Sequence, residues 1–227
     1  MTAKEEDILT SQSLLKQGVA VDRFLDSILV DNSIDIDSLL VGDKNAIIIA
    51  ARASGYGDLY ETKVTCPSCG MNSEIPVSLK ECSISTHGYI DTEALEPIDG
   101  VTGPNSLGNY LITLPVSKAV FEVKLMDGRG EKDFTKRVET RKKKKQGEAL
   151  LTDQFKVYTQ SINGVTDLRQ IYKFIDNLPV RDSRVLRNAY SEISPNMDLK
   201  YDFFCIHCTH EQEVSVPITA QFFWPDV

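Results

Sequence analysis

The pattern of apolar and polar positions along the chain predicts both helices and strands. Apolar residues recurring three and four positions apart are typical of a helix with one buried face, and strict alternation is typical of a strand. Because the chain contains both kinds of segment, we expect an α+β fold. The predicted helices cover 24–29, 44–52, 131–150, 168–178 and 182–193, and the predicted strands cover 58–66, 73–79, 109–114, 119–126, 155–163, 199–204 and 213–218.

Capping residues and helix breakers predict where several of these helices begin and end. Asp43 can accept hydrogen bonds from the free N–H groups that open the helix over 44–52, and Gly55 can end that helix. Pro179 separates the last two helices, because proline lacks a backbone N–H group. Asp182 is expected to cap the helix that follows it.

The chain is expected to consist of an arm and one domain. Residues 1–36 are polar and acidic with one short helix, and we interpret them as an N-terminal arm. Residues 37–227 are predicted to form a single α+β domain, a size within the usual range for one domain. Within that domain, frequent glycines and prolines predict a long interaction loop over 82–109.

Four of the five cysteines form two pairs with the spacing of a metal knuckle. Cys66 and Cys69 enclose Pro-Ser, Cys205 and Cys208 enclose Ile-His, and an alternating strand pattern follows each pair. Two residues between cysteines let one tight turn direct both sulfurs at a common point, and four thiolates suit zinc. The sequence therefore predicts a split zinc ribbon, in which two CxxC β-hairpins close the chain around one ion.

The two zinc knuckles are expected over 64–79 and 203–218, with helices and a β-hairpin inserted between them. A site with four thiolate ligands has no open position for water or substrate, so its zinc is structural. Because the ligands come from distant parts of the chain, metal binding is expected to be coupled to folding.

Other interpretations of the cysteine pairs remain open. A redox pair of the thioredoxin type needs a CxxC at the start of a helix, whereas both pairs here precede strand patterns. Buried unpaired thiols, an open catalytic zinc site and two separate metal sites are further alternatives. Additional ligands for separate sites would come from Cys82, His87, His207 or His210.

Charge is unevenly distributed along the chain. The protein has 25 Lys and Arg against 33 Asp and Glu, a formal net charge of −8. One short basic run opposes this trend and is predicted to dock on an acidic partner surface. It comprises Lys136, Arg137, Arg141, Lys142, Lys143, Lys144 and Lys145. An ordinary solvated helix face is the alternative, and nucleic acid is disfavoured because the rest of the chain is acidic.

Three aromatic residues follow one another near the last position of the sequence: Phe222, Phe223 and Trp224. Clustered aromatic side chains usually become buried, either in the protein's own core or against a partner. Both outcomes remain open, and a partner contact is one of the two expectations.

No segment of the sequence points to catalysis or to membrane insertion. The chain contains no P-loop, no G-x-G-x-x-G and no H-E-x-x-H motif. No apolar run approaches the ~20 residues that cross a bilayer. The acidic start of the chain lacks the pattern of a signal peptide, so we expect a non-enzymatic intracellular protein with reduced thiols.

The order of several short motifs carries a family resemblance. LLVGDK at 39–44 leads into an apolar helix that ends RASGYG at 52–57, and the knuckle VTCPSCG at 64–70 follows. Further on come ITLP at 112–115, IDNLP at 175–179, ISP at 193–195 and FFC at 203–205. Taken together, this order resembles the baseplate hub proteins and hub-assembly factors of T4-like contractile-tailed bacteriophages. The resemblance spans roughly 37–227 and leaves out residues 1–36 and the basic run.

This resemblance implies a non-enzymatic structural or assembly component of a phage baseplate hub. Its expected partners are other baseplate and hub proteins, with no membrane span and no small-molecule substrate. Its expected locations are the host cytoplasm during assembly and the tail baseplate of the virion. A zinc-ribbon protein that binds nucleic acid or assists transcription is the alternative, based on the knuckles together with the basic run.

Overall fold

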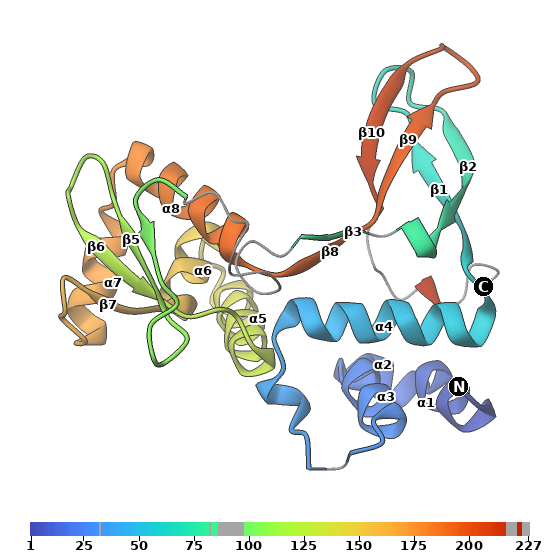
Figure 1. Ribbon diagram of the computed structural model, residues 1–227, viewed down its shortest axis with the longest axis horizontal. Helices are drawn as coiled ribbons and strands as arrows, with labels where there is room; N and C mark the ends of the chain where they lie inside the picture. The colour runs from blue at the N-terminus through green and yellow to red at the C-terminus, as the bar shows by residue number, and fades with distance from the viewer. Residues whose placement is uncertain (32, 82, 86–97, 217–221, 224–227) are drawn as a thin grey trace. The chain divides into compact units, whose positions relative to one another are not determined.

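The computed structural model describes residues 1–31, 33–81, 83–85, 98–216 and 222–223 (Figure 1). The protein is α+β, as the sequence pattern predicts. Contacts between Cα atoms divide the chain into two compact units. Unit 1 comprises Met1–Ile36, Gly42–Ser85 and Asn196–Val227, and unit 2 comprises Asp37–Val41 and Thr86–Pro195. The division into an arm over 1–36 and one domain over 37–227 stays a prediction.

The helices of unit 1 enclose a core that the polar N-terminal segment helps to build. They are α1 (Ala3–Thr10), α2 (Gln12–Gln17), α3 (Ala20–Ile28) and α4 (Val41–Tyr56). Leu9, Phe24 and Leu25 are almost completely buried and lie in one cluster with Ile48 and Ile49 of α4. The helix α4 begins at Val41, so Asp43 lies in its first turn and does not occupy the expected capping position.

The strands of unit 1 form short antiparallel pairs. In Figure 1 two hairpins stand side by side, one made of β1 (Leu59–Thr65) and β2 (Asn72–Ser78), the other of β9 (Lys200–Phe204) and β10 (Glu211–Ser215). A third pair joins β3 (Ser83–Ser85) to β8 (Asn196–Asp198). The β3–β8 pair links the early and late parts of unit 1, so it is non-local and loop-closure entropy opposes it.

Unit 2 is a four-stranded antiparallel sheet packed against helices. The sheet has the order β4 (Val101–Thr102), β5 (Tyr110–Thr113), β6 (Val120–Val123) and β7 (Thr159–Ile162). The helices are α5 (Gly128–Lys143), α6 (Leu150–Tyr158), α7 (Leu168–Asp176) and α8 (Val180–Ile193). Ile112 and Phe121 of the sheet share a core with Phe155, Ile171 and Leu186 of the helices. No helix in the described ranges is long and apolar enough to cross a membrane.

The predicted strand over 155–163 is wrong over its first half. Residues up to Tyr158 belong to α6, and only Thr159–Ile162 form the strand β7. Phe155 and Tyr158 are both buried and lie three positions apart, a spacing that serves the buried face of a helix. The predicted helix over 131–150 ends at Lys143, and α6 begins at Leu150.

Asp182 does not cap α8 in the expected way, since the N-cap position is occupied by Pro179. Its buried carboxylate instead accepts hydrogen bonds from the backbone N–H groups of Val116 and Ser117, each at 2.8 Å, in the turn between β5 and β6. Burial acts to raise the pKa of Asp182, but the bonds from Ser117 and Val116 outweigh it and lower this pKa. Asp182 therefore ties α8 to the sheet.

Candidate metal centre

The two cysteine pairs lie at the tips of the two hairpins of unit 1 and have the same local hydrogen bonds. The N–H group of Cys66 donates to the carbonyl of Met71 at 2.8 Å, and that of Gly70 donates back to the carbonyl of Cys66 at 2.9 Å. In the second hairpin, Cys205 bonds in the same way to His210 and Thr209, at 2.9 Å each. In each turn, hydrogen bonds therefore hold both the N–H group and the carbonyl group of the first cysteine.

The position after the second cysteine of each turn requires a left-handed backbone. Gly70 adopts φ 73° in the first turn, and Thr209 adopts φ 57° in the second. Glycine has this conformation at no steric cost, whereas a β-branched residue is strained there. The second hairpin therefore contains a strained residue at the position where the first has a glycine.

Exchange of these two residue types is expected to change stability in opposite directions. Gly70→Ala should lower the free energy of unfolding by about 1 kcal/mol, since a Cβ would meet no atom within 4 Å and only the backbone conformation opposes it. Thr209→Gly should raise it by a similar or smaller amount. Denaturant unfolding of metal-loaded protein measures both, and a stabilised Gly70→Ala variant would contradict the left-handed turn.

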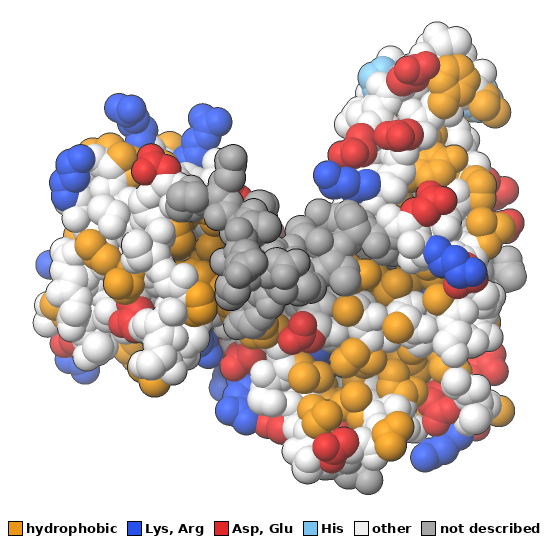
Figure 2. Space-filling model, viewed as in Figure 1, with side chains coloured by type: hydrophobic (Ala, Val, Ile, Leu, Met, Phe, Trp, Pro, Cys, Tyr) orange, Lys and Arg blue, Asp and Glu red, His pale blue; other side chains and the backbone are white. Residues whose placement is uncertain are grey.

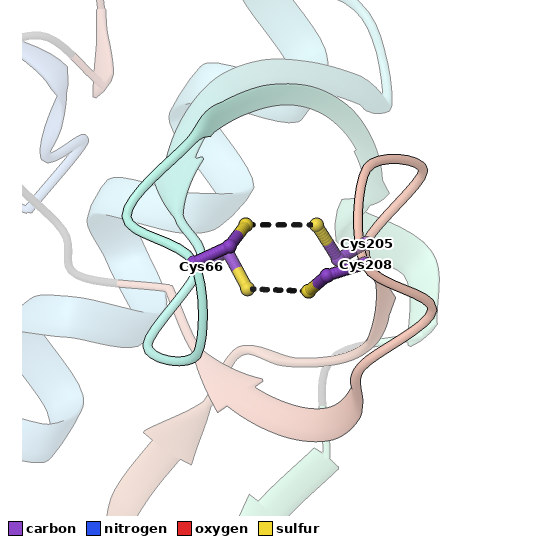
Figure 3. Close-up of side chains that lie close together, drawn as sticks. Cys66, Cys205 and Cys208 are labelled. Atoms are coloured by element: carbon purple, nitrogen blue, oxygen red, sulfur yellow. Dashed lines mark hydrogen bonds between the residues drawn. The ribbon is translucent and has the colours of Figure 1, made fainter.

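The sulfurs of the two hairpin tips converge on one point (Figure 3). All four Sγ atoms lie within 4.8 Å of one another. The distance is 3.7 Å from Cys66 to Cys208 and 3.7 Å from Cys69 to Cys205. A disulfide needs ~2.05 Å, whereas a tetrahedral ion with metal–sulfur bonds of ~2.3 Å places its sulfurs ~3.8 Å apart. The four cysteines could therefore hold a metal ion.

The thiols of the first pair have unusual acidities. Burial opposes the thiolate of Cys66, but the backbone N–H groups of Cys69 and Ser68 stabilise it, and its pKa is lowered to about 6. The N–H group of Met71 favours the thiolate of Cys69, but burial and the neighbouring sulfurs outweigh it and raise this pKa to about 12. Neighbouring thiolates repel one another, so the four cysteines do not all ionise readily by themselves. A bound cation would compensate this repulsion.

The histidines near the second pair do not join the cluster. His207 is exposed, and the Nε2 atom of His210 lies 3.3 Å from the side-chain oxygen of Gln212. Among the described residues, the only group of potential metal ligands is the four cysteines. The other two alternatives, Cys82 and His87, lie outside the described residues.

The basic run divides into paired and unpaired residues. Arg137 bonds to Asp133 and to the hydroxyl of Tyr172, and Arg141 bonds to the buried carboxylate of Asp153. Such pairs fasten α5 to α6 and α7, which is a structural role within unit 2. Lys143 makes only a long exposed contact at 3.8 Å with Glu139. The exposed members of the run are Lys136, Lys142, Lys143, Lys144 and Lys145.

The aromatic residues at 222 and 223 lie in the core of unit 1. Phe222 packs edge-on against Tyr60 with ring centroids 4.9 Å apart, and Phe223 packs against Phe24 at 5.1 Å. The buried guanidinium of Arg52 donates to the carbonyl of Phe222 at 2.9 Å. Of the two expected outcomes, the structure has burial in the protein's own core. Trp224 lies outside the described residues.

Sequence reasoning missed two polar features that the fold creates. It read Asp182 as a helix cap, although the residue serves the β5–β6 turn. It also overlooked three arginines at three-residue spacing in α8, at positions 181, 184 and 187. That spacing on a predicted helix places like charges on one face, and this pattern could have identified the arginines from the sequence.

Comparison with known proteins identifies the family. The sequence model of the family described as T4 bacteriophage base plate protein matches residues 1–224. The chain belongs to this family. Its match includes residues 1–36 and the basic run, so the expectation that the resemblance begins near residue 37 is corrected. Neither the search of curated proteins nor the search of solved structures found a match.

Proposed function

We propose that this member of the base plate protein family is a non-enzymatic component of the baseplate hub of a contractile-tailed phage, stabilised by a structural zinc ion. Family membership supports a structural or assembly role in a phage baseplate. The assignment to the hub, the bound zinc and the lack of catalytic activity are our additions to what family membership supports. The convergence of four cysteine sulfurs from two ends of the chain is the single observation that carries the zinc proposal.

Zinc is the metal that this donor set fits best. Four thiolates at tetrahedral spacing suit zinc or an iron site of the rubredoxin type, and zinc needs no redox partner. Cys66, Cys69, Cys205 and Cys208 would hold the ion, which would supply no catalytic chemistry because its four positions are filled. The ion would instead fasten the β1–β2 hairpin to the β9–β10 hairpin, against the entropy of closing a loop of more than 130 residues.

Metal analysis of the purified protein tests the zinc proposal. We expect one zinc per chain by elemental mass spectrometry, and cobalt substitution should give the absorption of four-sulfur tetrahedral coordination. Acidification should release the metal, since protons compete with the ion for thiolates. Iron in place of zinc, or a cobalt spectrum of mixed nitrogen and sulfur ligands, would contradict the assignment.

Co-expression tests the role in the baseplate. The full chain, expressed with the other hub proteins of its phage, should be recovered in complex with at least one of them. It would act in the host cytoplasm during assembly and in the tail of the virion. A chain that binds none of these proteins and is absent from purified tails would overturn the hub proposal while leaving the metal site untouched.

We assign the exposed lysines of the basic run to a partner surface. They lie on α5 and on the segment that follows it. Lys136 and the four lysines over 142–145 project from unit 2, whereas Arg137 and Arg141 are engaged within it. Exchanging the four lysines for glutamine should weaken a hub complex, more at low salt than at high salt, with little effect on unfolding. Phe222 and Phe223 are buried, so we assign them no partner contact.

A further inference from the structure

One exposed side of α8 has a row of arginines. Arg181, Arg184 and Arg187 are spaced about 4.5 Å apart along the helix axis and lie opposite the buried residues Leu186 and Ile193. All three are exposed, and within the described part of the chain none of them forms an ion pair or a side-chain hydrogen bond. We name these three residues the arginine face.

The helix α8 itself has little negative charge to oppose the arginine face. Glu192 is the exposed acidic residue of α8, and the other acidic residue of this helix, Asp182, is buried. Val180, at the first position of the helix, has 85% of its surface exposed and adds an apolar contact beside the arginines. Arginine is enriched at protein interfaces, so several arginines on one exposed helix side are typical of a contact surface.

The hairpin β9–β10 has an exposed face of the opposite charge. Asp202 and Glu213 are direct partners across the two strands, and Glu211 is the partner of Phe204 on the same face. Like charges paired across strands destabilise a hairpin, so this arrangement has a cost within the chain. An exposed ion pair from Lys200 to Glu213 at 3.3 Å compensates part of this cost. We name Asp202, Glu211 and Glu213 the acidic hairpin face.

The acidic hairpin face also has an apolar centre. Phe204 lies between the carboxylates with half of its surface exposed, and Ile206 in the adjoining turn is 75% exposed. Figure 2 shows Asp and Glu side chains along this hairpin, and Lys and Arg side chains projecting from unit 2 in the region of α8. Each face therefore has charged groups around an apolar contact, with opposite signs on the two faces.

The negative charge of the chain is concentrated in unit 1. Unit 1 has 17 acidic and 8 basic residues, a net charge of −9, and unit 2 has 16 acidic and 17 basic residues, a net charge of +1. Two whole chains repel each other because each has a net charge of −8. Beyond a Debye length of ~8 Å that repulsion is screened at physiological salt, and complementary faces in contact determine the outcome.

We propose that the arginine face of one chain binds the acidic hairpin face of a second copy. The three arginines would pair with the carboxylates of the hairpin, and Val180 would pack on Phe204. Such a contact is heterologous, so each added chain leaves one face of each kind free, and the assembly either closes into a ring or grows as an open filament. The inference adds a second copy as partner and depends neither on zinc nor on the hub assignment.

Sedimentation velocity of the full-length, metal-loaded chain tests this contact. At about 150 mM salt the wild type should show mass that rises with concentration, and at about 500 mM salt it should be monomeric. Arg184→Glu with Arg187→Glu should raise the dissociation constant by about tenfold or more. Asp202→Lys with Glu213→Lys should do the same. The matched control is Arg169→Glu with Lys173→Glu, an equal charge change on exposed residues of α7, which should leave association unchanged.

Mixing the two variants gives the decisive measurement. The first variant has two acidic faces and the second has two basic faces, so each associates poorly alone. An equimolar mixture should recover association, because every contact between unlike chains again joins opposite charges. A wild type that stays monomeric at the lower salt concentration, an equal loss in the α7 control, or a mixture that remains dissociated would overturn the proposal. Unchanged circular dichroism and metal content exclude misfolding as the cause.

Discussion

Replacing Cys66 or Cys205 with serine is expected to abolish tight metal binding and to lower the free energy of unfolding by about 4 kcal/mol or more. Binding of zinc to four thiolates contributes on the order of 10 kcal/mol to folding, and a three-thiolate site loses much of it. Both residues are almost completely buried between the hairpins, so the serine hydroxyls would also lack solvent. Elemental analysis and denaturant unfolding measure the two effects.

The fifth cysteine supplies the matched control for this experiment. Cys82→Ser makes the same chemical change at a cysteine that is not one of the four proposed ligands and should leave one metal ion per chain. The wild type treated with a chelator should unfold at a denaturant concentration close to that of the two variants and not below it, because all three lack the tightly bound ion and only the variants bury a serine hydroxyl. Retention of one ion per chain in both Cys66→Ser and Cys205→Ser would show that the cysteine pairs do not share a site.

Asp182→Asn is expected to destabilise unit 2 by about 2–4 kcal/mol. The carboxylate of Asp182 accepts two backbone hydrogen bonds, from Val116 and Ser117, and hydrogen bonds to a charged group contribute about 1.5–3 kcal/mol each. An amide has one acceptor oxygen, so its NH₂ group would face a backbone donor. Thermal unfolding, with hydrogen exchange of the β5–β6 turn as local probe, measures the loss.

The pH dependence of this effect has a defined sign. Because the folded pKa of Asp182 is lowered, its contribution is fully present above the unfolded value of ~3.9 and is lost as the pH falls through the lower folded value. The difference between wild type and Asp182→Asn should therefore be large at neutral pH and small in strong acid. Asp167→Asn is the control, since Asp167 caps α7 at an exposed position where asparagine caps equally well. An equal loss in both variants would refute the specific role of Asp182.

Local patterns predicted many elements of this fold because their causes are local. The amphipathic spacing in 168–178 and 182–193 corresponds to α7 and α8, and the alternation at 109–114 corresponds to β5. Pro179 separates α7 from α8 as expected, through its fixed φ and missing donor. Where the pattern was short, as over 155–163, helix and strand could not be distinguished, and packing of Phe155 with Tyr158 favoured the helix.

Prediction failed where a residue serves a partner that is distant along the chain. Asp182 has the composition and position of a helix cap, but its hydrogen bonds go to a turn 65 residues away. Leu9 and Phe24 belong to a short N-terminal stretch, yet both are buried in a core that also contains residues 222 and 223, a contact that no local pattern predicts. A sequence pattern records how much apolar surface a segment has, not which surface will cover it.

By itself, the sequence determined the α+β class, the two knuckle turns and the uneven charge. Each depends on neighbouring residues: the period of apolar positions, two residues between cysteines, and the composition of short runs. Only the tertiary structure decided that the four sulfurs meet within 4.8 Å, that the aromatic pair is buried, and that three arginines lie together unpaired. The sulfur cluster and the buried aromatic pair require contacts between segments more than 100 residues apart, and the exposed arginines require that no other segment covers them. Contacts over such distances along the chain depend on the packing of the whole core.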